Sequence, residues 1–211
     1  MTEVRKLWIP GDGIRLESAL RVAERPRALA AVMHPHPLHG GTLHNPVIFH
    51  SDRELHRVGM TTLRFNSRGT GESEGTHDDG RGEIEDIAAA VAWLRGLAPG
   101  VPMLLVGFSF GAVCSIGYAI RDANIRGVIA LGLPVDKYPF DELPLLKRPL
   151  FVVQAENDEF GTPDRVRQRT EGMQPAATIR VIENTTHLFP ERARDAASAV
   201  VDSAETLLSD R

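Results

Sequence analysis

Short runs of mainly apolar residues alternate with longer amphipathic segments along most of the chain. Apolar runs without polar alternation are typical of parallel strands covered on both faces. We expect such strands at residues 28–33, 61–65, 103–106, 128–131 and 150–153, and a shorter strand at 178–182. Helices are expected at residues 47–58, 83–97, 112–121, 162–172 and 192–208. This alternation predicts an α/β fold with a mostly parallel sheet and helices on both faces.

The first part of the chain has a different pattern. Residues 7–9 are followed by the turn-forming segment 10–13, and apolar and polar residues then alternate over 14–22. Alternation of this kind is typical of a half-buried strand. We therefore expect an N-terminal hairpin that adds an antiparallel edge to the sheet, within a single domain over residues 1–211.

Composition narrows the function classes. The chain has 42% apolar residues, a net charge of −4 and no basic block, which argues against nucleic acid as a partner. No apolar run approaches the roughly 18 residues of a membrane span, so no membrane partner is expected. One cysteine and no apolar signal-peptide stretch favour a cytoplasmic protein.

Acidic residues near the start of the helix at 83–97 are expected to form a solvated face (Asp78, Asp79, Glu83, Glu85, Asp86). The oligomeric state stays open.

A Gly-x-Ser-x-Gly motif joins the strand at 103–106 to the helix at 112–121. It runs from Gly107 to Gly111, with Ser109 at its centre. A serine nucleophile must stand exposed on a strained strand-to-helix turn, and small residues two positions away on each side avoid collision. The motif therefore predicts Ser109 as a nucleophile. Cys114, inside the following helix, is expected to be a small buried apolar residue.

A serine nucleophile needs a histidine base and an acid that orients it. In this type of fold the order along the chain is serine, acid, histidine. His187 is the only histidine after Ser109, and it follows the last predicted strand. Glu156, Asp158 and Glu159 compete for the role of acid in the loop after residues 150–153, and we choose Asp158, with Asp136 in reserve.

These features together resemble the α/β-hydrolase superfamily from end to end, within it the small capless proteins near the dienelactone-hydrolase and carboxylesterase branch. Ala155 stands where the acid loop of that family usually has glycine. The namesake of the branch uses cysteine where this chain has Ser109, so its activity is not implied. The glycine-rich segment 66–75 resembles an architectural loop of the superfamily. Only residues 134–147 occupy the place where larger relatives insert a lid, so no large cap domain is expected.

Four histidines lie within eleven residues after the first parallel strand: His34, His36, His39 and His44. We discount a metal site because no acid or cysteine is near in sequence to complete a common zinc set. The His-Pro-His-Pro-x-x-Gly-Gly pattern instead resembles the oxyanion loop of the capless subgroup. Two backbone N–H groups hold an oxyanion, one from the residue after the nucleophile, Phe110. Since prolines 35 and 37 have no N–H, the second donor is His36 or Leu38, and we prefer His36.

The sequence thus predicts a serine hydrolase that cleaves an ester or similar acyl bond of a small soluble substrate. The predicted triad is Ser109, His187 and Asp158, and no cofactor or metal is expected. A peptidase, amidase or acyltransferase would use the same triad. The non-enzymatic alternative is a binding protein that has a hydrolase fold but no catalytic activity.

Overall fold

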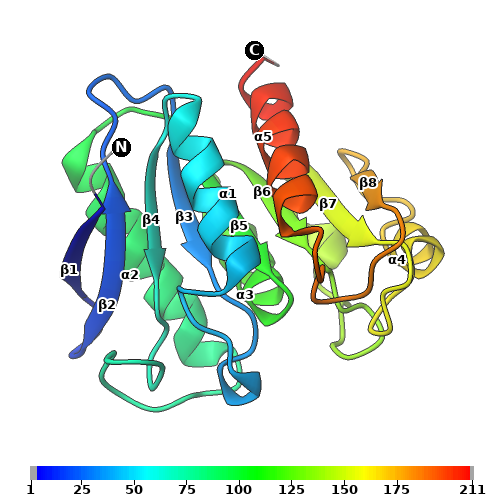
Figure 1. Ribbon diagram of the computed structural model, residues 1–211, viewed down its shortest axis with the longest axis horizontal. Coiled ribbons are helices and arrows are strands. Elements are labelled where there is room, and N and C mark those ends of the chain that lie inside the picture. The colour runs from blue at the N-terminus through cyan, green and yellow to red at the C-terminus, as the bar shows by residue number, and fades with distance from the viewer. Residues whose placement is uncertain (1–3, 210–211) are drawn as a thin grey trace.

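The computed structural model describes residues 4–209 and contains one eight-stranded sheet (Figure 1). The order of the strands across the sheet is β1-β2-β4-β3-β5-β6-β7-β8. Their bounds are β1 (Arg5–Pro10), β2 (Arg15–Arg21), β3 (Leu29–Met33), β4 (Thr61–Phe65), β5 (Met103–Phe108), β6 (Ile125–Leu131), β7 (Leu150–Ala155) and β8 (Thr178–Ile182). The hairpin β1–β2 and the pair β2–β4 are antiparallel, and the other pairs are parallel. The predicted fold class is confirmed.

The described residues also form five α-helices and two short 3-10 helices, and all but α5 lie between strands in the chain. They are α1 (Pro46–Arg57), α2 (Arg81–Leu97), α3 (Phe110–Arg121), α4 (Pro163–Arg169) and α5 (Ala193–Ser209), with η1 (Pro37–His39) and η2 (Leu143–Leu145). The helix expected at 162–172 ends three residues early, because Gly172 adopts a φ of +80° that a helix cannot continue. The sequence pattern did not predict η1 and η2, which are single turns.

The helices cover both faces of the sheet and create two cores. Apolar residues of α1 and α5 pack on one face, and those of α2 and α3 pack on the other (Figure 1). The sequence of strand β3 is apolar without alternation because its two faces belong to two different cores. Ala30 and Val32 belong to the core under α1 and α5, whereas Leu29, Ala31 and Met33 belong to the core under α2 and α3. Successive side chains point to opposite faces, and both faces are buried.

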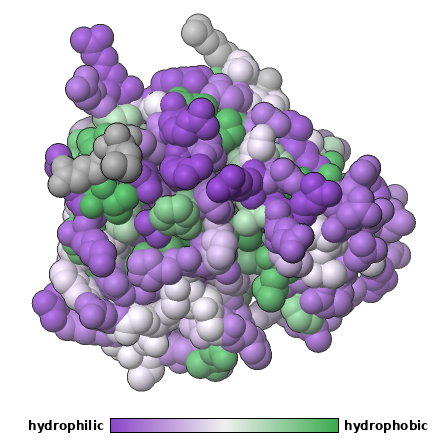
Figure 2. All heavy atoms as spheres, in the orientation of Figure 1, coloured by the Kyte–Doolittle hydropathy of each residue, from purple (hydrophilic) through white to green (hydrophobic). Residues whose placement is uncertain are grey.

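Within residues 4–209, no separate cap domain covers the sheet. The segment 132–149 between β6 and β7 packs onto the body of the protein, with Phe140, Leu143 and Leu146 buried in the core. The outer surface in the view of Figure 2 is mainly hydrophilic, with small scattered hydrophobic patches. None of the helices in residues 4–209 is both long and apolar enough to cross a membrane.

Candidate active site

Ser109 occupies a sharp turn between β5 and α3, at the carboxyl end of the central strands. Its backbone has φ of +54° and ψ of −116°, a region that residues with a side chain rarely adopt. A Cβ on Gly107 would lie 2.2 Å from the carbonyl oxygen of Gly111, and a Cβ on Gly111 would lie 2.5 Å from that of His34. The motif therefore needs glycine at both positions, as expected from the sequence.

Ser109, His187 and Asp158 form a continuous hydrogen-bonded chain. Ser109 Oγ lies 2.8 Å from His187 Nε2, and His187 Nδ1 lies 2.9 Å from each carboxylate oxygen of Asp158. In the neutral imidazole, Nδ1–H then donates to the carboxylate and Nε2 accepts from the serine hydroxyl. All three side chains are buried, with Ser109 the most accessible at 8% exposed. The tertiary structure thus brings together the three residues that the sequence singled out.

The four acids that the sequence offered as partners of the histidine make different contacts in the structure. Only Asp158 contacts the imidazole; Phe160 N–H donates to its Oδ1 at 2.9 Å and the Gln154 amide to its Oδ2 at 2.8 Å. Glu156 and Glu159, on either side of it, accept hydrogen bonds from the backbone N–H groups of Asn184 and His187, in the loop after β8. Asp136, the reserve choice, instead pairs with Arg165 at 2.8 Å.

Aromatic rings enclose His187. The ring centroid of Phe160 lies 4.6 Å from that of His187 in an edge-on arrangement, and Phe108 lies 5.5 Å away. Gly132 at the end of β6 has a φ of +50°, and a Cβ there would lie 3.1 Å from the imidazole Cε1. The sequence analysis missed Gly132. A glycine directly after a strand that neighbours the nucleophile strand was the available signal.

The histidine-proline loop after β3 folds back beside Ser109. A Cβ on Gly41 would lie 2.0 Å from the carbonyl oxygen of Pro35, so only glycine permits this close return. Leu38 N–H already donates to the Nδ1 atom of His36, at 3.3 Å. The loop lines a pocket of about 380 Å³ over the serine and histidine. Its walls are Pro35, His36, His39, Gly40, Gly41, Asn45, Ser109, Glu159, Phe160, His187 and Leu188.

The four clustered histidines of this loop differ in burial: His34 is buried, His36 is half-buried, and His39 and His44 are exposed. Within residues 4–209, no group of three or more His, Cys, Asp or Glu side chains could hold a metal ion. His34 is buried, with Nδ1 2.6 Å from the carbonyl oxygen of Pro35 and Nε2 accepting from Ser67 N–H at 3.0 Å. Burial lowers the pKa of His34 to about 4, so its ring is neutral at neutral pH. Thus His34 ties the histidine-proline loop to the glycine-rich loop.

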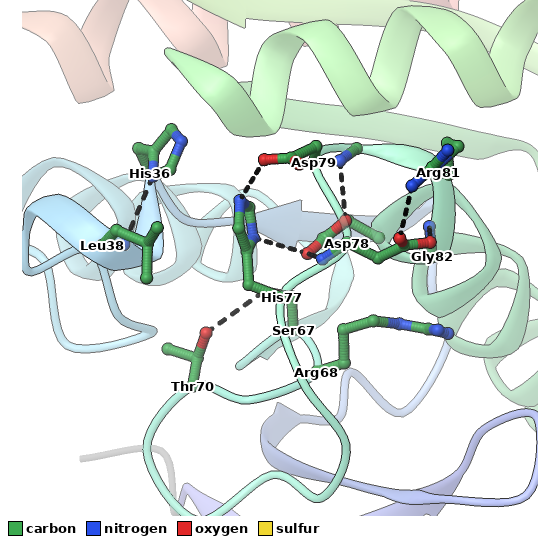
Figure 3. Close-up of polar contacts among 12 residues, drawn as sticks. His36, Leu38, Ser67, Arg68, Thr70, His77, Asp78, Asp79, Arg81 and Gly82 are labelled. Carbon is green, nitrogen blue, oxygen red and sulfur yellow. Dashed lines mark hydrogen bonds and ion pairs between the residues drawn. The ribbon is translucent and has the colours of Figure 1, made fainter.

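His77 is a further histidine of the site that the sequence analysis missed. Figure 3 shows it between His36 and Asp79. Its ring centroid lies 4.9 Å from that of His36 and 5.4 Å from that of Phe110, and its Nδ1 lies 2.7 Å from Glu83 Oε1. His77 therefore contacts both residues expected to supply oxyanion donors. Its polar loop gave no periodic signal, and its ring partners His36 and Phe110 come from distant segments of the chain.

The acidic cluster around the start of α2 is only partly solvated, which corrects the expectation of a solvated acidic face. Asp79 is exposed, but Glu83 and Asp86 are completely buried. Glu83 accepts hydrogen bonds from two backbone N–H groups before the helix, and Asp86 forms an ion pair with Arg68 at 2.8 Å. The contacts between Arg68 and Asp86 hold the glycine-rich loop against α2, in agreement with its expected architectural role.

Comparison with known proteins places the chain in a family. The model of the alpha/beta hydrolase domain family matches residues 30–207. An uncharacterized protein of Rickettsia prowazekii (strain Madrid E) is 33% identical over 97% of this chain and 90% of its own length. Two solved structures are similar throughout. One is a serine hydrolase without lid from Xanthomonas campestris, with 29% identity, coverage of 98% and 95% of the two chains and a TM-score of 0.88. The other is a serine hydrolase homologue from Coxiella burnetii, with 30% identity, coverage of 96% and 98% and a TM-score of 0.88. The match to the family model and the similarity to these relatives show that the chain belongs to the α/β-hydrolase superfamily. The fold and the nucleophile turn of the chain agree with this membership, which supports a hydrolase activity.

Proposed function

We propose that this protein is a serine hydrolase that cleaves an ester or similar acyl bond of a small soluble substrate. The observation that carries the proposal is the hydrogen-bonded chain from Ser109 through His187 to Asp158, built on a strained turn beside an open pocket. Such a chain activates a hydroxyl that is a weak nucleophile in isolation.

In the proposed reaction, Ser109 Oγ attacks the acyl carbon while His187 Nε2 takes the hydroxyl proton. The imidazolium that forms is stabilised by Asp158, and its proton then passes to the leaving group as the bond to the acyl carbon breaks. A water molecule repeats the attack on the acyl-enzyme with His187 as base. The acid product leaves, and Ser109 regains its proton.

Two backbone N–H groups are proposed to hold the oxyanion of the tetrahedral intermediates. Phe110 is the first residue of α3, where backbone N–H groups have no partner within the helix. The second donor is His36, since Leu38 N–H is occupied by the His36 ring. The pocket beside these groups is open to solvent and small, which supports a small soluble substrate.

Replacement of the nucleophile tests the proposal. Ser109→Ala is expected to abolish labelling by a fluorophosphonate and to lower kcat for a short p-nitrophenyl ester by about 10⁴-fold or more. Ser115→Ala is the matched control, because Ser115 is a buried serine of α3, six positions after Ser109. If Ser109→Ala keeps the native rate and labelling, the proposal is wrong. A panel of esters, amides and acyl acceptors then identifies the bond that is cleaved.

A further inference from the structure

Glu159 places a carboxylate in the wall of the pocket, next to the residues of the proposed triad. It directly follows Asp158, and its side chain lines the pocket together with Ser109 and His187. Its Oε2 atom accepts a hydrogen bond of 3.1 Å from the backbone N–H of His187. The mechanism proposed above gives this carboxylate no task. Glu159 is an exposed residue, and this hydrogen bond orients its carboxylate beside His187.

In residues 4–209, no lysine or arginine side chain pairs with this carboxylate. The lining residues include no lysine or arginine, and Glu159 has no ion pair with any residue in the described part of the chain. Burial and the neighbouring rings of His77 and His39 lower the pKa of His36, which keeps its ring neutral at neutral pH. The nearby ammonium group of Lys137 lies over the ring of Phe160, 4.9 Å from its centroid, and does not line the pocket.

We propose that Glu159 selects substrates by charge. The pocket takes esters whose acyl part is neutral or carries a cation, and it discriminates against esters that carry a carboxylate. The inference rests on the proposed function and names its substrate class. Two unit charges about 6 Å apart, at an effective dielectric constant of about 40 to 80, change a rate by about threefold to tenfold. A substrate carboxylate inside so small a pocket meets Glu159 at distances of that order.

Three methyl esters with the same six-carbon acyl chain test the selection. Methyl hexanoate is neutral, monomethyl adipate carries a carboxylate, and methyl 6-aminohexanoate carries an ammonium group. The kcat/KM of each ester is measured from the methanol released, for the wild type and for Glu159→Gln. The glutamine keeps the size of the side chain and an oxygen that accepts from His187 N–H. We expect the adipate-to-hexanoate ratio to rise about threefold to tenfold in the variant, and the aminohexanoate-to-hexanoate ratio to fall.

Glu156→Gln is the matched control. Glu156 lies in the same loop, is exposed and accepts a backbone N–H in the same way, from Asn184 at 2.8 Å, but it does not line the pocket. The variant changes the net charge by the same amount, and both ratios are expected to stay at wild-type values. Raising the NaCl concentration from 0.05 to 0.5 M should shrink the difference between wild type and Glu159→Gln, since salt screens a pocket open to solvent.

The outcomes separate the two proposals. One outcome is that the wild type hydrolyses methyl hexanoate and both ratios in Glu159→Gln stay within twofold of the wild-type ratios. This outcome overturns the role of Glu159 and leaves the proposed function intact. Equal shifts in Glu156→Gln also overturn it, because they would reflect net charge alone. If the wild type hydrolyses none of the three esters and does not react with a fluorophosphonate, the proposed function fails, and the inference fails with it. Glu159→Ala serves as a second variant if the glutamine variant does not fold.

Discussion

The side-chain amide of Gln154 donates a hydrogen bond of 2.8 Å to Asp158 Oδ2. The same Nε2 atom donates to the carbonyl oxygen of Gly161 at 2.7 Å, and Oε1 accepts from Leu133 N–H at 2.8 Å. Gln154 is completely buried near the end of β7. One amide therefore connects the end of β6, the acid loop and the carboxylate that faces His187. This arrangement makes Gln154 a positioning residue for Asp158.

Replacing Gln154 by methionine should lower activity and stability together. Methionine has a similar volume but cannot hold the carboxylate or satisfy Leu133 N–H. We expect kcat/KM for a p-nitrophenyl ester to fall about tenfold to hundredfold as Asp158 loses its fixed orientation. The free energy of unfolding in urea should fall by about 1–3 kcal/mol.

Thr62→Val is the control that separates loss of activity from loss of stability. Thr62 is a buried residue of β4 that donates a hydrogen bond to Asp52, far from the acid loop in the sheet order. We expect a comparable loss of stability with little change in kcat/KM. Equal losses of activity in the two variants would show that Gln154 acts through stability alone.

A proline at position 36 should remove one oxyanion donor with little change in the backbone. His36 has a φ of −55°, which a proline ring accommodates, so His36→Pro deletes the N–H group. We expect kcat to fall about 10²- to 10³-fold. His36→Ala removes the ring but keeps the N–H group, and its loss should be below about tenfold. Steady-state kinetics on one p-nitrophenyl ester compares them, and equal losses in both variants would exclude His36 N–H as a donor.

His34 should make stability depend on pH between about 6.5 and 4. Burial lowers its pKa in the folded state to about 4, below the ordinary value of 6.5. Between these values the unfolded chain binds the proton and the folded chain does not. The contribution is therefore fully present above pH 6.5 and is lost as the pH falls toward 4.

Urea unfolding at pH 7 and pH 5 measures this loss. The wild type should lose about 2 kcal/mol more than His34→Gln, whose amide does not titrate. His44→Gln, a change at an exposed histidine, should keep the wild-type dependence. An identical pH dependence in wild type and His34→Gln would contradict the assignment.

The thiol of Cys114 should be unreactive in the folded protein. Cys114 is 1% exposed within α3, and burial raises the pKa of its thiol well above the usual range. We expect no reaction with an aromatic disulfide reagent at pH 8 in native buffer and one thiol per chain in 6 M guanidinium. Cys114→Ala should keep ester hydrolysis and fluorophosphonate labelling. Rapid native labelling, or loss of hydrolysis in the variant, would reopen a role for this cysteine.

Much of the architecture could be predicted from the order of residues. Continuous apolar runs, alternation and helical periodicity predicted the eight strands and five α-helices. A strand buried on both faces is apolar throughout, whereas an element buried on one face repeats its apolar positions. Element ends were predicted less exactly. Helix α4 stops at Arg169, three residues before the expected end, because Gly172 adopts a φ of +80° that a helix cannot continue. The single turns η1 and η2 are too short to produce a repeat.

The sequence by itself determined the sheet, the glycines of the nucleophile turn and the segments that would supply a serine, an acid and a histidine. These features depend on residues close together in the chain. Only the tertiary structure decided which acid faces His187, that Gln154 holds it, that His77 packs on His36 and Phe110, and that Glu159 lines the pocket. Ser109 and His187 are 78 positions apart, and contacts across such distances arise from the pairing of strands, which leaves no local pattern in the sequence.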